Sequence, residues 1–133
     1  MQARLRDRFA QYEARFFRDS ASMIDWLRQH LPQTLAIALD HDLELVADDS
    51  GHMTDPGTGR EVAEFLAQQS PQCRVMIHSS NAVAAVGMET VLQDAGWTTS
   101  RVVPYDDLAW IGDWFLALRK AIVDHAHTCS PAL

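Results

Sequence analysis

The sequence predicts a single α/β domain with three layers, in which a parallel sheet carries helices on both faces. Short apolar runs alternate along the chain with longer segments whose apolar residues recur at helical spacing. This alternation is typical of parallel strands, because two parallel neighbours must be joined by a crossover, usually a helix. A length of 133 residues with 47% hydrophobic and 22% charged residues suits one ordinary globular domain. We expect the domain to span residues 1–127 and residues 128–133 to form a disordered tail.

The first third of the chain is expected to supply two helices and one or two strands. Residues 2–14 carry apolar side chains at helical spacing, and a second helix is expected to begin with Ser20 or Ser22 as its cap. Residues 14–18 fit either an extension of the first helix or a short edge strand, and their aromatic pair favours the strand. Residues 35–39 form an apolar run and therefore predict a buried strand.

The rest of the chain continues the alternation after an acidic loop. Residues 40–57 contain no Lys or Arg, and we expect them to form a flexible, strongly anionic loop. Thr58 and Glu61 have the spacing of a capping box, so a helix should begin near residue 59. The remaining predicted elements are a strand over residues 74–77, a helix ending near Gly96, a strand over residues 99–103 and a helix over residues 108–125.

Charge and cysteine content limit the possible function. The formal net charge is −7, but residues 1–18 carry +3 and the remainder −10. An acidic body argues against binding along a nucleic-acid backbone, which requires a basic surface. Cys73 and Cys129 have no C-x-x-C spacing, so a disulfide framework is not expected and a cytoplasmic location fits. The sequence has no apolar run near 18 residues, so we expect no membrane association.

Two polar clusters follow two of the predicted strands directly. The clusters are Asp40-His41-Asp42, after the strand over residues 35–39, and His78-Ser79-Ser80-Asn81, after the strand over residues 74–77. The carboxyl ends of parallel strands lie along one edge of a sheet, and ligands bind in the crevice there. We therefore expect the two clusters to form one site.

The first cluster and His78 have the side chains of acid–base and metal chemistry. Asp40 and Asp42 are separated by one residue and could converge on Mg²⁺ or Mn²⁺, divide the roles of ligand and base, or simply be solvated. His41 and His78 are candidate acid–base groups, with structural hydrogen bonding as the alternative. His78 is the stronger candidate, because hydroxyl and amide groups follow it.

The polar residues that follow His78 lie at a predicted helix N-terminus. Free N–H groups and the helix dipole favour an anion there, so Ser79, Ser80 and Asn81 are candidate phosphate ligands. Plain helix capping is the equal alternative. Arg60 could likewise bind a phosphate, or pair with acidic neighbours.

The motifs Leu39-Asp40-His41-Asp42-Leu43, Thr58-Gly59 and Ile77-His78-Ser79-Ser80-Asn81 occur in that order. With them the chain resembles the cyclic-phosphate-processing receiver domains, a divergent branch of the receiver fold. The resemblance implies a receiver-like, flavodoxin-like parallel sheet of four or five strands, with Asp40 at the phosphoacceptor position of receivers. Two features depart from receivers: their first strand, with its acidic pair, is apparently absent, and Val103 stands where they carry a lysine. An ordinary phosphorelay role is therefore disfavoured.

The two polar clusters, together with what the resemblance implies about the substrate, predict a metal-dependent phosphoesterase. It would act on a cyclic or terminal phosphate of a small ligand, a nucleotide or a nucleic-acid end. The expected residues are Asp40 and Asp42 for Mg²⁺ or Mn²⁺, His78, His41 and Asp40 for catalysis, and Ser79, Ser80, Asn81 and Arg60 for phosphate. The alternative is a non-catalytic receiver-like interaction or signalling module. In that case the apolar last helix, with Trp110 and Trp114, would pack against a partner or form a homodimer.

Overall fold

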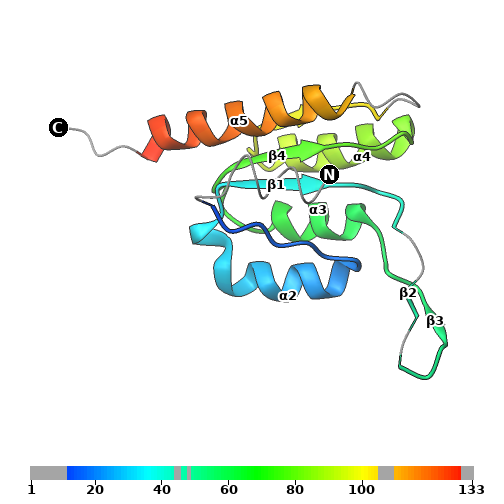
Figure 1. Cartoon of the computed structure of the whole chain (residues 1–133). Coiled ribbons are helices and arrows are strands. Elements are labelled where there is room, and N and C mark those ends of the chain that lie inside the picture. Colours follow the sequence, from blue (N-terminus) through cyan, green and yellow to red (C-terminus); the bar gives the residue numbers. More distant parts are fainter. Residues whose placement is uncertain (1–11, 44–45, 48, 105–109, 130–133) are drawn as a thin grey trace.

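The computed structural model describes residues 12–43, 46–47, 49–104 and 110–129, arranged in three layers (Figure 1). The central layer is a parallel sheet with the order β1–β4–β5, formed by β1 (Ala36–Leu39), β4 (Arg74–Ile77) and β5 (Thr99–Arg101). The predicted α/β class is confirmed. Among the described residues this sheet has three strands, one fewer than the minimum expected.

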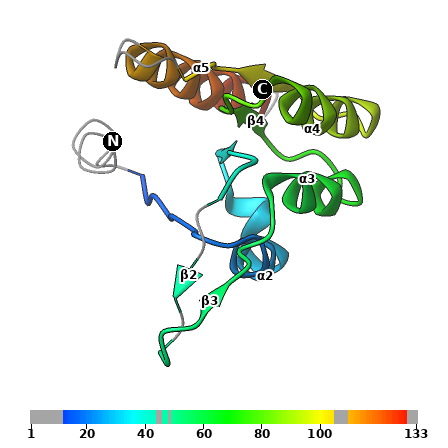
Figure 2. The same cartoon turned by 90° about the vertical axis from the view of Figure 1, so that its right-hand side faces the viewer.

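In the described part of the chain, four helices cover the two faces of the sheet. The helices are α2 (Ser20–His30), which continues into the 3₁₀ turn η1 (Leu31–Gln33), α3 (Gly59–Ala67), α4 (Ala82–Asp94) and α5 (Trp110–Cys129). Helices α2, α3 and α4 lie on one face and α5 on the other (Figure 2). None of the helices in the described part of the chain has the length and apolarity needed to cross a membrane.

The residue that caps the N-terminus of α2 is Asp19 rather than a serine. The carboxylate of Asp19 accepts a hydrogen bond from the backbone N–H of Ser22 at 2.7 Å, so Asp19 is the cap and the prediction of Ser20 or Ser22 is wrong. Ser20 is instead buried, and its hydroxyl donates to Glu61 at 3.1 Å. The predicted capping box of Thr58 and Glu61 is present at the start of α3.

The segment that precedes α2, residues 12–19, forms neither the helix nor the edge strand that we expected. Residues 12–19 contain neither helix nor strand, so both alternatives for residues 14–18 are wrong. The helix predicted over residues 2–14 lies mostly outside the described part of the chain, which begins at residue 12. Phe17 packs against Trp26 with ring centroids 5.9 Å apart. An aromatic contact with α2 therefore takes the place of strand pairing.

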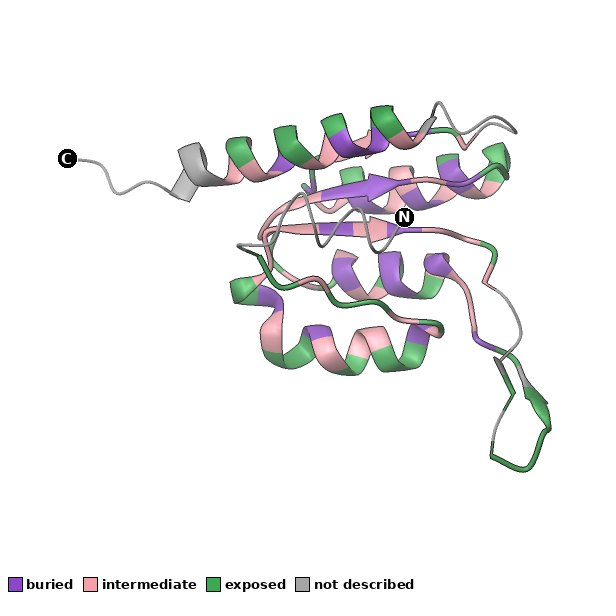
Figure 3. Cartoon of the chain, viewed as in Figure 1, coloured by how far each residue is buried: buried purple, intermediate pink, exposed green. Residues whose placement is uncertain are grey.

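The acidic loop contains a small antiparallel hairpin, which the sequence did not predict. Strand β2 (Val46–Ala47) pairs with β3 (Met53–Thr54), and Gly51 has a φ of +85° in the turn between them. The hairpin projects away from the sheet, and the residues in it whose burial is described are exposed (Figure 3).

The core lies in two parts, one on each face of the sheet. The face toward α2, α3 and α4 buries Ile37, Leu39, Val75 and Ile77 with helix residues such as Leu66. The other face packs the apolar residues Met76, Val102, Trp114, Phe115 and Ala121 together. Most of the apolar stripe of α5 is therefore used within its own chain, and the predicted homodimer stays a prediction.

The end of α5 differs from the predicted boundary. The helix extends to Cys129, so residues 128–129 are helical and do not belong to a tail; residues 130–133 lie outside the described part of the chain. Arg74 holds α5 to the sheet, donating to Asp124 at 3.2 Å and to the hydroxyl of Ser100 at 2.9 Å.

Candidate functional site

Asp40 and His78 follow neighbouring parallel strands at the same level. In the register of β1 and β4, Leu39 lies opposite Ile77, and the N–H of His78 donates to the carbonyl of Leu39 at 3.0 Å. The backbone ladder therefore extends one residue beyond the strands. This register confirms that the two polar clusters lie along the same edge of the sheet.

His78 is half-buried beside the aromatic side chain of Trp114. The two rings meet edge to face with centroids 6.4 Å apart. Burial lowers the pKa of His78 below its usual 6.5, because the surroundings solvate an imidazolium poorly, and the negative charge of Asp40 opposes this shift in part. The imidazole is therefore neutral at pH 7 and able to accept a proton.

The backbone of residues 40–42 is held against the start of α3. Gly59 donates its N–H to the carbonyl of His41 at 3.3 Å, and Asp42 forms an antiparallel bridge with Thr58. The α-carbon of Gly59 lies against the carbonyl of Asp40, leaving no room for a side chain. Close packing against α3 thus positions the first polar cluster, which sequence reasoning placed only after a strand.

His41 and Asp42 form a pair of neighbouring side chains. Nδ1 of His41 lies 2.9 Å from a carboxylate oxygen of Asp42, which is largely exposed. Because an ionised carboxylate only accepts hydrogen bonds, the proton of a neutral His41 ring lies on Nδ1. Nε2 is then the acceptor nitrogen of this ring.

The polar residues after His78 form the N-terminal cap of α4. The carboxamide oxygen of Asn81 accepts from the N–H of Ala84 at 3.1 Å, and the hydroxyl oxygen of buried Ser79 accepts from the N–H of Asn81 at 3.1 Å. Capping, the alternative that the sequence left open, is thus present, while Ser80 is exposed. The phosphate-binding roles of these three residues stay predictions.

Arg60 points its guanidinium group along α3 and toward α4. Its Nε lies 3.0 Å from Glu64, one turn further along α3, and Nη1 lies near Gly87 of α4. Pairing with an acid, the second alternative for this residue, is therefore what the structure contains. Arg60 as a phosphate ligand stays a prediction.

Asp40 and Asp42 are the two candidate ligands for the predicted metal ion. No group of three or more His, Cys, Asp or Glu side chains suited to a metal occurs in the described part of the chain. Mg²⁺ often binds through only one or two carboxylates plus substrate phosphates and water. A metal cage made by the protein alone is not present among the described residues, and metal binding by Asp40 and Asp42 stays a prediction.

A groove that the sequence did not reveal reaches the site. It has a volume of about 610 Å³ and lies between β1, α2, α5 and residues 12–17, with Asp40 and His78 at one end. Its lining includes Trp26 and Trp114. No local signal could have predicted it, because it depends on how these four segments pack.

These features define a receiver-like α/β domain with a polar site at the carboxyl edge of its sheet. Residues 5–94 match the family model of the cyclic-phosphate processing receiver domain, and the chain belongs to that family. No curated protein and no solved structure matches the chain.

Proposed function

We propose that this domain is a phosphoesterase that opens a cyclic phosphate or removes a terminal one, on a nucleotide or an RNA end. The observation that carries the proposal is the placement of Asp40 and His78 after neighbouring parallel strands, with the charge of Asp40 acting on His78. Membership of a family described as processing cyclic phosphates supports the same class of substrate.

In the proposed reaction, neutral His78 accepts a proton from the attacking water as its oxygen bonds to phosphorus. The bond from phosphorus to the 2′ or 3′ oxygen breaks, and that oxygen takes a proton from the imidazolium, which restores the neutral ring. The carboxylate of Asp40 stabilises the imidazolium while it exists. Atoms and charge therefore balance with water as the only co-reactant.

The phosphate would bind at the start of α4. The first N–H groups of a helix lack partners within the helix, and the helix dipole attracts an anion. The hydroxyl oxygen of Ser79 and the carboxamide oxygen of Asn81 already accept hydrogen bonds in the cap. Ser79 would therefore bind phosphate through its O–H group, and Asn81 through the N–H groups of its side-chain carboxamide. Exposed Ser80 and, after leaving Glu64, Arg60 would add further donors.

A divalent cation would bind to Asp40 and Asp42 together with phosphate oxygens. When bound, Mg²⁺ or Mn²⁺ supplies charge neutralisation at the phosphate. His41, held by Asp42, would lie next to these ligands and provide a second acid–base group.

The test compares hydrolysis of 2′,3′-cyclic AMP by the wild type and by His78→Gln, with Mg²⁺ or Mn²⁺ present. Gln keeps a hydrogen-bonding group but cannot accept the proton, so turnover should fall by roughly 10²–10⁴-fold with little change in melting temperature. His125→Gln, on α5, is the matched control and should keep its activity. Absence of turnover by the wild type on cyclic and terminal phosphates would favour the non-catalytic interaction module instead.

A further inference from the structure

Arg60 is a cation in the first turn of α3, where the electrostatics of a helix disfavour one. The N-terminal turn of a helix carries a partial positive charge, which stabilises acidic side chains and opposes basic ones. Arg60 is the second residue of α3 and follows Gly59, whose α-carbon lies against the carbonyl of Asp40. Residues that oppose a local preference in this way are expected at functional sites. An anion bound beside this turn would offset the repulsion.

The ion pair that Arg60 forms with Glu64 is a weak one. Nε of Arg60 lies 3.0 Å from the carboxylate of Glu64, and the two side chains are 43% and 56% exposed, so water and salt screen the attraction. The order of the charges is also the less favourable one, because an acid stabilises a helix more when it precedes the base by four residues. The guanidinium group can therefore exchange Glu64 for another anion at little cost.

Gly87 gives the guanidinium group of Arg60 its place on α4. A β-carbon at residue 87 would come within 2.8 Å of Nη1 of Arg60, so the group lies against the surface of this helix. Ala84 is on the same face of α4, roughly 5 Å nearer the N-terminus, and its N–H is the one that Asn81 caps. Both residues of this row are small. The surface of α4 between the guanidinium group and the candidate phosphate site therefore carries no long side chain from this row.

We propose that phosphate at the start of α4 competes with Glu64 for Arg60, so that Glu64 sets the affinity of the site for phosphate. This inference rests on the phosphate site of the proposed function. In the free protein Glu64 holds the guanidinium group. When phosphate binds, the group turns toward the first turn of α4 and donates two parallel hydrogen bonds to phosphate oxygens, a geometry that arginine favours. Glu64 is then a positioning residue, because it acts on the phosphate only through Arg60.

The first test is Glu64→Gln, with the Kd of inorganic phosphate measured by NMR titration. Loss of the competing charge should lower the Kd by about two- to fivefold, the range that exposed ion pairs represent. The matched control is Asp25→Asn, which removes the acid of a comparable exposed pair, 3.0 Å from Arg28 on α2, and should leave the Kd unchanged. In the wild type, the Nε–H resonance of Arg60 should shift during the titration.

A double-mutant cycle separates competition from a general effect of charge. Arg60→Ala should raise the Kd on the order of tenfold, because it removes hydrogen bonds between charged groups. In the Arg60→Ala protein, Glu64→Gln should no longer change the Kd, since competition requires the arginine. Gly87→Ala should fold, because alanine is the better helix former, and should displace the guanidinium group from α4. It should therefore raise the Kd, again only while Arg60 is present.

Three results would overturn the inference. The first is equal affinity of the wild type and Glu64→Gln for phosphate. The second is the same tightening by Glu64→Gln with and without Arg60, which would assign the effect to plain charge repulsion. The third is a wild type that does not bind inorganic phosphate.

Turnover of 2′,3′-cyclic AMP by the same proteins tests the proposed function separately. Phosphate binding with the expected variant effects but without turnover would reject the phosphoesterase and keep the competition. Turnover by the wild type with an unaltered Kd in Glu64→Gln would reject the competition alone.

Discussion

The α-carbon of Gly59, the first residue of α3, lies against the backbone carbonyl of Asp40, the residue that follows β1. A β-carbon at residue 59 would overlap that carbonyl, and it would also come within 3.1 Å of the sulfur of Met88. The start of α3 and the acidic end of β1 can therefore approach each other only because residue 59 is a glycine.

Gly59→Ala should consequently displace the Asp40 backbone or the start of α3. Forced overpacking of this kind costs about 1–3 kcal/mol, measured as the free energy of unfolding in urea. The matched control is Gly112→Ala in α5, where an added β-carbon meets no atom within 4 Å. Alanine is the better helix former, so the control should be neutral or stabilising by up to about 1 kcal/mol. Equal effects of the two substitutions would contradict the close contact at Gly59.

The lowered pKa of His78 predicts how stability depends on pH. The unfolded chain, with a histidine pKa near 6.5, binds the proton before the folded chain does as the pH falls. The free energy of unfolding should therefore decrease on acidification through about pH 6.5, until the lower pKa of the folded state is reached. His78→Gln should flatten this decrease in urea titrations between about pH 5 and 8. An unchanged slope would show that His78 titrates normally.

Metal binding by Asp40 and Asp42 predicts a rise in melting temperature with Mg²⁺ or Mn²⁺. A ligand at a hundred times its Kd stabilises the folded state by about 2.7 kcal/mol, which raises the melting temperature of a domain of this size by several degrees. Replacing both residues by Asn should abolish the rise. Zn²⁺ is unsuitable as the probe, because His125 and His127 could bind it independently. No rise at millimolar Mg²⁺ or Mn²⁺ would remove the metal from the proposed mechanism.

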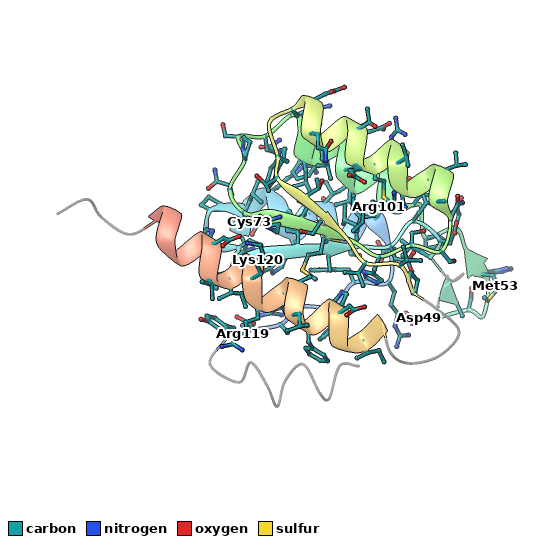
Figure 4. All side chains as sticks on the ribbon, turned by 90° about the horizontal axis from the view of Figure 1, so that it is seen from above. Asp49, Met53, Cys73, Arg101, Arg119 and Lys120 are labelled. Carbon is teal, nitrogen blue, oxygen red and sulfur yellow. The ribbon has the colours of Figure 1, made fainter. Side chains whose placement is uncertain are left out.

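Cys73, which directly precedes β4, should react slowly with alkylating agents. Burial raises the pKa of its thiol to about 12, so the reactive thiolate at pH 8 should be on the order of 10³-fold rarer than for an ordinary cysteine. Figure 4 shows Cys73 at the end of the sheet opposite Met53 and its hairpin, and thus away from the candidate site. Peptide mapping after iodoacetamide treatment, in buffer and in urea, measures the effect. Equal labelling of Cys73 in both conditions would contradict the burial.

Local sequence signals determined the elements that frame the site. The apolar runs before Asp40 and His78 form β1 and β4, and the capping box begins α3 at the expected residue. These predictions succeeded because periodicity, caps and buried strands are encoded within a few neighbouring residues. The shared edge of the two polar clusters followed from the parallel arrangement of the strands.

Tertiary structure decided what depends on partners far along the chain. Residues 14–18 do not form a strand, and Phe17 packs on Trp26 of α2 instead, a contact that the local sequence does not specify. The choice of Arg60 between Glu64 and a phosphate is likewise a competition between partners that a sequence pattern cannot rank. The groove beside β1 exists only because α2, α5 and residues 12–17 come together around this strand. Its position follows from the packing of segments distant in sequence, for which the chain carries no local signal.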